Sequence, residues 1–504
     1  MDIQWVELCT LPINVLKNNF TFFGGKITLI SPYEQKEAHE NIKFVKLERV
    51  AAIVDVVSVA EMRNMSLIEM IKFRIEWAKD KMDFAINDDK LLETLKSGEK
   101  FDLLLFDIAQ DDALLGIAHY LNIPVVAMSS GGPSIWSDEM TASPFNPAYD
   151  QNKNFGLPAV MGFYDRLKNS ALAIIDVAFY HYYYVPSQET LYRKFFKDLI
   201  PEPMPRLIDL IHKVDLVLLN SHPLVEQPRA LPQNSIEVGG MHLKIQDDEV
   251  QPEFVNIMNK AVNGIIYFSL GGNLKSSDLP MEKLEVFLKI FAEMNNVLVL
   301  WKFETVALRE RHANNIIIGP WLPQQEILNH KNLKAFITHG GLLSTLEAIN
   351  YGKPVIGIPF FNDQKANMAR VVSQGYGVTI DYDSLNEESL RKAIDLIFND
   401  ASYKSNAERL SIIFKDQPIK PVDKAVFYVE YVIANGAGYL KTAATKLSLC
   451  QLYLADQIVF LLSLIALALL ITIWSISSFV KWVKSKFQKR TKSHPIKNPK
   501  KKQN

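Results

Sequence analysis

Residues 458–480 form an uncharged, strongly apolar run near the C-terminus. As an α-helix, these 23 residues extend about 35 Å, enough to cross the roughly 30 Å hydrocarbon core of a bilayer. The alternative is a buried core helix. Lysines and an arginine follow at once between residues 481 and 490, and such charges mark the cytoplasmic flank of a membrane span. We therefore expect a transmembrane helix over residues 458–480.

The charge of the chain is divided unevenly. Residues 481–504 hold ten Lys or Arg and no acidic residue, so the formal net charge of −1 leaves a balance of −11 for the rest of the chain. An acidic bulk gives no basis for nucleic-acid binding. Lys501 and Lys502 stand where a di-lysine retrieval signal of the endoplasmic reticulum places them, which makes the membrane of that organelle the expected location.

Cysteine is scarce, since Cys9 and Cys450 are the only two in 504 residues. Two cysteines cannot form a disulfide framework, and their separation excludes a CxxC redox or metal motif. The sequence therefore predicts no metal site.

A cytoplasmic tail places the bulk of the chain in the lumen, which requires a secretory signal peptide. None is visible, because Asp2 and Glu7 stand where positive charge is wanted and the early apolar run is short and broken. Either the chain is tail-anchored with its bulk in the cytosol, or its start comes from an alternative or mispredicted first exon. Tail anchoring moves ten positive charges across the membrane, so the second explanation is favoured. The sequons at Asn19 and Asn64 suit a lumenal domain.

Short apolar runs alternate with helical stretches before the membrane segment, the pattern of parallel sheets wrapped by helices. In the first half this pattern predicts buried strands at residues 26–31, 102–107, 123–129 and 215–221. In the second half it predicts six more, at residues 264–270, 297–303, 315–321, 334–341, 354–360 and 377–382. Two doubly wound α/β domains are expected. No strand is recognisable before residue 26.

Three stretches stand apart from this alternation. Residues 156–200 are apolar and aromatic on most faces, so an acceptor wall, a membrane-touching helix pair and plain core are all open. The polar, proline-containing stretch at 242–254 is a plausible linker. Residues 424–440 predict a closing helix that ends in a glycine-rich stop.

The richest motif begins in the apolar run at 334–341. His339-Gly-Gly forms a turn at the carboxyl end of the strand in this run, and a helix opens after it. Ligands of open α/β sheets bind at this edge, and a helix N-terminus there favours a diphosphate. Gly340 and Gly341 allow close approach of the backbone. The chain contains neither a Walker loop nor a GxGxxG motif, so a nicotinamide or flavin site is not expected.

Each residue of this region also has a purely structural interpretation. Ser344 and Glu347 fit a capping box, and Asp363 fits a helix N-cap. Trp321 could be a core residue and His339 a structural histidine. Their combination at this spacing favours a single ligand site over separate structural roles.

The segment from Trp321 to Val372 resembles the signature of the UDP-glycosyltransferase family, and HGGLLSTLEAI is most similar to its animal, particularly insect, branch. FSLGGN, VGGMH and DQPIKPVDKAVFYVE agree with the same family, as do the anchor and the basic tail. The resemblance extends from about residue 25 to the end. It implies a GT-B architecture, with two Rossmann-like domains and one C-terminal transmembrane helix.

The resemblance also implies a division of the chain. It gives an N-terminal acceptor-binding domain at 1–237, a linker at 238–254, a UDP-sugar-binding domain at 255–423, a closing helix and juxtamembrane segment at 424–457, the transmembrane helix at 458–480 and a basic cytoplasmic tail at 481–504. The implied co-substrate is a UDP-sugar, with glucose the usual sugar in the insect branch. Neither a cofactor nor a metal is implied.

Donor roles carry over by position. Trp321 would stack on uracil beside Gln324, Glu347 would bind the ribose hydroxyls, His339, Gly341 and Ser344 would hold the diphosphate, and Asp363 and Gln364 would bind the sugar. In the FSLGGN loop, Gly271 would line the donor site, and Gly272 replaces the serine usual in the family, which removes one hydroxyl contact to phosphate but keeps the backbone N–H.

Family members invert the anomeric carbon with a histidine as general base and an aspartate that orients it. Asp107 matches that aspartate, although a helix cap is the alternative and Asp111 and Asp112 lie nearby. The histidine belongs after the first strand, yet residues 1–25 contain none and His39 comes too late. We therefore expect this chain, as written, to lack its general base.

Three functions follow from these observations. The first is sugar transfer to a small lipophilic acceptor, as the family does in detoxification and in pigment or hormone metabolism. The second is an inactive membrane-bound homologue that binds the donor and pairs with active relatives. The third is a cytosolic tail-anchored binding module. The sequence leaves open whether the chain forms a homo- or hetero-oligomer.

Overall fold

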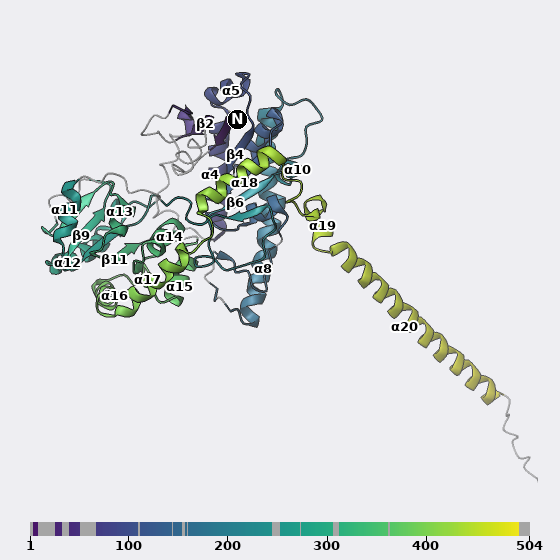
Figure 1. Cartoon of the computed structure of the whole chain (residues 1–504). Coiled ribbons are helices and arrows are strands. Elements are labelled where there is room, and N and C mark those ends of the chain that lie inside the picture. The colour runs from purple at the N-terminus through teal and green to yellow at the C-terminus, as the bar shows by residue number, and fades with distance from the viewer. Residues whose placement is uncertain are drawn as a thin grey trace, which may run out of the picture. The chain divides into compact units, whose positions relative to one another are not determined.

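The computed structural model describes residues 4–8, 26–32, 40–50, 67–108, 111–143, 145–153, 157–158, 160–243, 252–272, 274–305, 312–360 and 363–492. The chain forms two compact units, residues 1–445 and 446–504. The first unit contains two wholly parallel sheets with helices around them (Figure 1). His39, Asn19 and Asn64 lie outside the described residues.

The first sheet has the order β3-β2-β1-β4-β5-β6-β7. Its strands are β1 (Gln4–Leu8), β2 (Lys26–Ser31), β3 (Ile42–Lys46), β4 (Leu103–Asp107), β5 (Val125–Ser129), β6 (Leu216–Leu219) and β7 (Ser235–Glu237). The four strands predicted from apolar runs are present. Three further strands were not predicted: β1 contains Gln4 and Glu7 among its five residues, and β3 and β7 lie at the two edges of the sheet.

The first strand, which is not recognisable in the sequence, is β1. β1 lies in the middle of the sheet, paired in parallel with β2 on one side and β4 on the other. Because β1 pairs Leu8 with Phe106, the chain leaves β1 at the same edge where β4 ends in Asp107.

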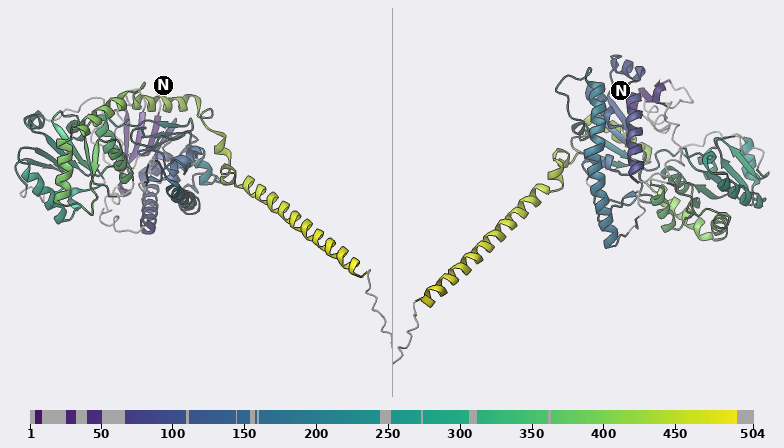
Figure 2. Two further views of the ribbon diagram at one scale, coloured as in Figure 1. Left: turned by 90° about the horizontal axis from the view of Figure 1, so that it is seen from below. Right: turned by 180° about the vertical axis from the view of Figure 1, so that it is seen from behind.

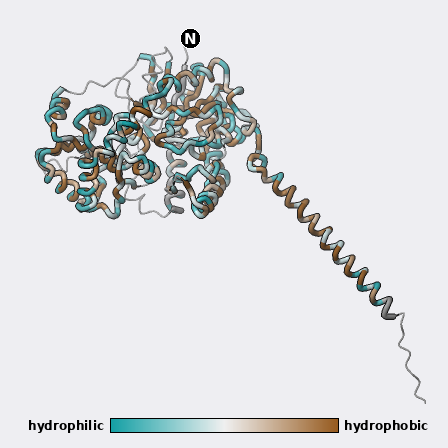
Figure 3. Tube along the Cα trace, turned by 60° about the horizontal axis from the view of Figure 1, so that its bottom comes forward, coloured by the Kyte–Doolittle hydropathy of each residue, from teal (hydrophilic) through white to brown (hydrophobic). Residues whose placement is uncertain are grey.

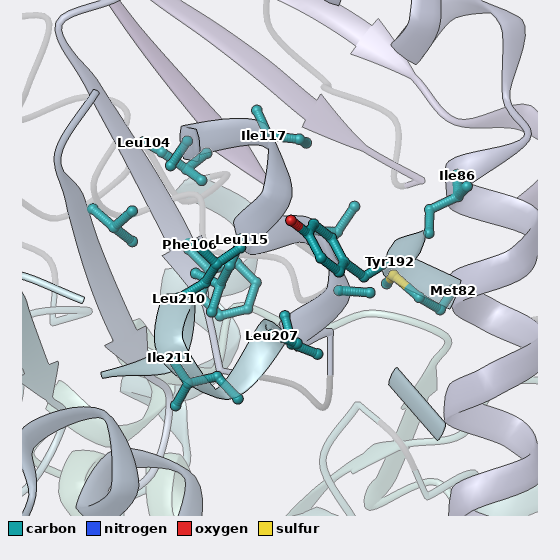
Figure 4. Close-up of a cluster of buried hydrophobic side chains, with 14 of the residues drawn as sticks. Met82, Ile86, Leu104, Phe106, Leu115, Ile117, Tyr192, Leu207, Leu210 and Ile211 are labelled. Carbon is teal, nitrogen blue, oxygen red and sulfur yellow. The ribbon is translucent and has the colours of Figure 1, made fainter. Parts of the chain in front are cut away.

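Helices cover the first sheet with a dense apolar core. They are α4 (Leu67–Ile86), α5 (Asp89–Lys96), η1 (Asp112–Leu114), α6 (Leu115–Leu121), α7 (Ile135–Thr141), α8 (Phe163–Phe179), η3 (Tyr180–Tyr184), α9 (Val185–Phe196) and α10 (Leu207–Ile211). Figure 4 shows part of this core, where Phe106 of β4 lies near Leu115 of α6 and Leu210 of α10. η1 and α6 follow one another over residues 112–121, between β4 and β5.

The aromatic stretch at 156–200 forms α8, the π-helical turn η3 and α9, which run on as one long helix (Figure 2). One side of this helix is core, because Tyr180 and Tyr184 are fully buried. The other side is not, because Ile174 and Tyr182 are exposed. The core interpretation therefore holds for only one face.

The second sheet has the order β10-β9-β8-β11-β12-β13, the strand order of Rossmann-type domains. Its strands are β8 (Ile265–Ser269), β9 (Leu298–Lys302), β10 (Ile316–Gly319), β11 (Leu333–Thr338), β12 (Val355–Gly357) and β13 (Gly377–Thr379), so all six predictions are confirmed. Its helices are α11 (Pro252–Lys260), η4 (Ser276–Asp278), α12 (Met281–Glu293), α13 (Gln324–Asn329), α14 (Leu342–Asn350), α15 (Gln364–Ser373), α16 (Glu387–Asn399) and α17 (Ala401–Lys415). The strand order reverses between β8 and β11, which is where ligands bind in such sheets.

The closing helix is α18 (Pro421–Asn435), and Gly436 follows it with a positive φ of 67°. Although α18 comes after the second sheet in the chain, it packs on the first. Val426 and Val429 lie in one apolar cluster with Leu103 of β4 and Leu216 of β6. The last helix of the first unit therefore returns to the sheet where the chain began.

The second unit contains α19 (Leu449–Leu452) and α20 (Ala455–Lys492). Residues 455–488 of α20 are long and apolar enough to cross a membrane, with a mean hydropathy of 2.7 in their most apolar window. None of that window is buried, which removes the support for a core helix. Figure 3 shows the helix as a predominantly hydrophobic rod.

Candidate active site

The turn after β11 has the geometry of an anion site. β11 ends at Thr338, His339 and Gly340 follow, and α14 begins at Leu342 with Gly341 as its N-cap. Glycine has no side chain to cap the first N–H groups of a helix, so they remain available to a ligand. Ser344 lies inside the first turn of α14, so the interpretation of Ser344 and Glu347 as a capping box is wrong.

Two glycines hold the His339 imidazole between them. A Cβ atom added to Gly271 would lie 2.6 Å from His339 Cε1, and one added to Gly341 would lie 2.4 Å from His339 Nε2. Gly271 also has a φ of +86°, which side chains rarely tolerate. The loop after β8 and the turn after β11 therefore meet across this one ring.

The His339 imidazole is neutral at physiological pH. Desolvation, together with the positive charge of Lys302, lowers the pKa of His339 to about 4. A neutral imidazole still donates one hydrogen bond, but it brings no positive charge to an anion.

Lys302 supplies the positive charge of this region. It ends β9, is buried, and donates from Nζ to the Gly271 carbonyl at 2.6 Å. Nζ also lies 3.3 Å from Glu304 Oε1 and 5.8 Å from the centre of the Trp321 ring. The sequence motifs did not point to this residue. The available signal was a lysine at the carboxyl end of an otherwise apolar strand.

A second group of side chains lies along α14 and α13. Gln324 Nε2 donates to Glu347 Oε2, and Gln324 Oε1 accepts from the Tyr267 hydroxyl at 3.1 Å. Gln325 Nε2 donates to Glu347 Oε1 at 3.3 Å. Trp321 is 70% exposed, which excludes the core interpretation. This second group therefore consists of the buried Glu347 carboxylate, the two glutamine amides that donate to it, and the exposed indole of Trp321.

Asp363 and Gln364 begin α15. Asp363 occupies the N-cap position but makes no side-chain cap, because its Oδ2 accepts from Asn367 Nδ2 at 2.7 Å. Asn367 Nδ2 also donates to the Gly340 carbonyl at 3.0 Å, which ties α15 to the turn after β11. Burial raises the pKa of Asp363, while Asn367 and the charge of Lys153 oppose that shift. Gln364 is buried and accepts from the Phe360 N–H at 2.8 Å.

Asp107 lies in the first sheet, at the carboxyl end of β4, and is buried. The helical turn that follows has Asp111 as its N-cap, so the cap interpretation does not apply to Asp107. Burial raises the pKa of Asp112 to about 7, against hydrogen bonds with Tyr184 and Tyr180 that lower it. Asp112 therefore belongs to the core beneath η3.

Within the described ranges, no group of three or more His, Cys, Asp or Glu side chains is placed to hold a metal ion. The polar side chains near the turn after β11 are instead carboxylates, amides, one neutral imidazole and one ammonium.

The family profile described as "UDP-glucoronosyl and UDP-glucosyl transferase" matches residues 26–491. The chain belongs to the UDP-glycosyltransferase family. It is 32% identical to UDP-glucosyltransferase 2 of Dactylopius coccus, over 87% of this chain and 84% of that one. It is 31% identical to the human 2-hydroxyacylsphingosine 1-beta-galactosyltransferase, over 84% of this chain and 77% of that one.

Solved glycosyltransferases share the fold of this UDP-glycosyltransferase. A UDP-glucose: anthocyanidin 3-O-glucosyltransferase in complex with UDP superposes with a TM-score of 0.56 at 16% identity, covering 86% of this chain and 99% of that one. The calicheamicin glycosyltransferase gives 0.57 at 15% identity, covering 87% and 100%. The predicted GT-B architecture is confirmed.

Three histidines and two aspartates predict how the stability of this UDP-glycosyltransferase depends on pH. Desolvation lowers the pKa of His222, His242 and His339 to about 4, below the value of about 6.5 in an unfolded chain, so these groups make the free energy of unfolding rise with pH from about 4 to 6.5. Burial raises the pKa of Asp112 and Asp138 to about 7, and these two groups make the free energy of unfolding fall over that range. His339→Gln removes one rising contribution, so the stability of this variant relative to the unmodified chain should fall as the pH rises from about 4 to 6.5. Thermal unfolding midpoints across this pH range test the prediction, and an unchanged slope would contradict it.

Proposed function

We propose that the turn after β11 binds the diphosphate of a UDP-sugar, and that the protein transfers the sugar, with inversion, to a hydroxyl of a small lipophilic acceptor. One observation carries the proposal: the His339 ring lies between Gly271 and Gly341, Gly341 is the N-cap of α14 with no side-chain cap, and the Lys302 ammonium is bonded to the Gly271 carbonyl. The family uses a UDP-sugar and an acceptor.

The nucleoside end of the donor fits the second group of side chains. Uracil stacks on the exposed face of Trp321, beside Gln324. The ribose hydroxyls donate to Glu347, because a diol is best recognised by a carboxylate that accepts both of its hydrogens. Gln324 and Gln325 hold that carboxylate in place before the ribose arrives.

The diphosphate accepts hydrogen bonds from the backbone N–H groups of Gly341 and Ser344. Gly271 and His339 lie on its opposite side. Since His339 is neutral, the dipole of α14 and Lys302 provide the positive potential. The same potential stabilises the UDP leaving group as negative charge develops on it.

Asp363 and Gln364, at the start of α15, bind the sugar. Asn367 fixes the Asp363 carboxylate, so that its second oxygen is presented to a sugar hydroxyl. We propose glucose, and hence UDP-glucose as co-substrate, because the insect relative is named a UDP-glucosyltransferase. Other relatives are named for galactose and glucuronic acid, so this assignment rests on the insect name.

Asp107 is the residue proposed to act on the acceptor side of the reaction. In the proposed mechanism Asp107 orients a histidine that takes the acceptor proton, and stabilises the imidazolium that forms. Residues 9–25, which follow β1 in the sequence, contain no histidine. That observation favours a second candidate, a catalytically impaired homologue that binds the donor and pairs with active relatives.

We place the protein in the endoplasmic reticulum membrane as a single-pass protein of detoxification metabolism. The length of α20, the ten basic residues beyond position 480 and Lys501 with Lys502 support a lumenal bulk and a cytoplasmic tail.

Replacing Lys302 distinguishes the binding of the diphosphate from the binding of the uracil ring. In Lys302→Met the affinity for UDP should fall about 10- to 100-fold, since a charge-assisted contact contributes about 1.5–3 kcal/mol. The affinity for uridine should not change, because uridine carries no phosphate. Trp321→Ala should weaken both ligands by a similar factor. Calorimetric titration of the unmodified chain and of both variants with UDP and with uridine gives the six affinities, and equal losses for UDP and uridine in Lys302→Met would contradict the assignment.

Turnover decides between the two candidate functions. In membranes containing the full chain, release of UDP from UDP-glucose is measured with a panel of lipophilic alcohols and phenols. An active enzyme should lose roughly 10²- to 10⁴-fold activity in Asp107→Asn while its affinity for UDP stays the same. UDP binding without turnover in the unmodified chain would favour the impaired homologue. Failure to bind UDP at all would contradict both.

A further inference from the structure

The loop between β6 and β7 lies beside the helix that begins at the proposed sugar-binding residues. Arg370 of α15 donates from Nη2 to the Pro223 carbonyl at 2.9 Å and from Nη1 to Gln227 Oε1 at 3.1 Å, and both acceptors belong to this loop. Arg370 follows Asp363 by seven residues, or about two helical turns, so the two side chains lie on the same side of α15. The loop therefore passes along the side of α15 that carries Asp363.

An ion pair joins this loop to the carboxyl edge of the first sheet. Lys153 Nζ donates to Glu226 Oε1 at 2.7 Å, and the two side chains are 34% and 15% exposed. A Cβ atom added to Gly132, in the segment between β5 and α7, would lie 2.4 Å from the same Glu226 oxygen. β5 pairs in parallel with β4, which ends in Asp107. The pair therefore lies on the side of the site that is proposed to bind the acceptor, with Lys153 accessible to a ligand.

The charges of this pair also act on Asp363. Burial raises the pKa of Asp363 and the bond from Asn367 lowers it, while the charge of Lys153 lowers this pKa and the charge of Glu226 raises it. Charges affect a carboxyl group in this way at short range, because solvent and salt screen them at longer distances. One ammonium thus lies near two carboxylates, Glu226 from the loop after β6 and Asp363 from the start of α15. The three groups together carry an excess of negative charge.

We infer that the Lys153–Glu226 pair selects the class of sugar on the donor, admitting a neutral hexose and disfavouring a uronic acid. The inference rests on the proposed function, in which Asp363 binds the sugar. The hydroxyls of a hexose donate to carboxylates and accept from an ammonium without adding charge. A uronate brings a third carboxylate to a place where Glu226 already neutralises Lys153, so it meets repulsion that no cation offsets. Relatives of the chain are named for both classes of sugar.

Glu226→Gln tests this inference, because it removes one charge, keeps the shape of the side chain and leaves the Lys153 ammonium for the ligand. The full-length protein is titrated calorimetrically with UDP, UDP-glucose and UDP-glucuronate. The affinity for UDP-glucuronate relative to that for UDP-glucose should rise about 10-fold, as expected when one carboxylate of a close pair is removed. The affinity for UDP, which carries no hexose, should not change. These are binding measurements, so they do not depend on turnover.

Two further variants extend the test. Lys153→Met leaves Glu226 and Asp363 unopposed, so the ratio of the two affinities should fall instead of rising. Glu99→Gln is the matched control, since Lys43 Nζ lies 2.6 Å from Glu99 Oε1 at the β3 edge of the first sheet. This control breaks an equally close pair and changes the net charge by the same amount as Glu226→Gln, and it should leave the ratio unchanged. A single cooperative thermal unfolding transition shows that each variant is folded.

Two results would overturn the inference while UDP binding, and with it the proposed function, stands. One is a ratio that does not shift in the stated direction in a folded variant of the pair. The other is a ratio that rises as much in Glu99→Gln as in Glu226→Gln, since the effect then comes from net charge alone. Failure of the unmodified chain to bind UDP would contradict the proposed function, and this inference with it. Opposite shifts in Glu226→Gln and Lys153→Met, with the affinity for UDP unchanged, support it.

Discussion

The contact on which the rest of the site depends is the packing of the His339 ring between Gly271 and Gly341. These glycines come from different loops, one after β8 and one before α14, and the ring leaves no space for a Cβ atom on either. The contact fixes the approach of the two loops at the point where the strand order of the sheet reverses. Because the ring is neutral, it does so without adding a charge that would need a partner.

Hydrogen bonds from neighbouring strands and helices hold the two loops that pack on His339. Lys302 holds the Gly271 carbonyl from one side, and Asn367 holds the Gly340 carbonyl from the other. Further along α15, Arg370 donates from Nε to the Leu224 carbonyl at 3.1 Å, and Gln374 donates to the same oxygen at 2.7 Å. Leu224 lies just after β6 of the first sheet. The helix that begins at the proposed sugar-binding residues is therefore bonded to the domain that is proposed to bind the acceptor.

The sequence predicted the parts of the fold that rest on continuous apolar runs. All six strands of the second sheet lie within apolar runs of that kind, whereas β1 contains Gln4 and Glu7, and β7 has a single apolar residue, Ile236, between Ser235 and Glu237, so neither was predicted. At the site, sequence reasoning identified the residues of the turn but not their supports. Lys302 and Asn367 act through contacts with carbonyl groups 31 and 27 positions away, which no local spacing reveals. The exposure of Trp321 and the start of α14 at Leu342 also had to come from the structure.

Two adjacent glycines give the most direct test of the central claim, that the loops packed on His339 form the UDP site. Gly271→Ala places a methyl group against His339, whereas a Cβ atom on Gly272 meets no atom within 4 Å. The measurement is the rise in thermal unfolding midpoint on addition of UDP to the full chain and to each variant. We predict protection of the unmodified chain and of Gly272→Ala, and little or none for Gly271→Ala. Equal protection of the two variants, or none of the unmodified chain, would contradict the account.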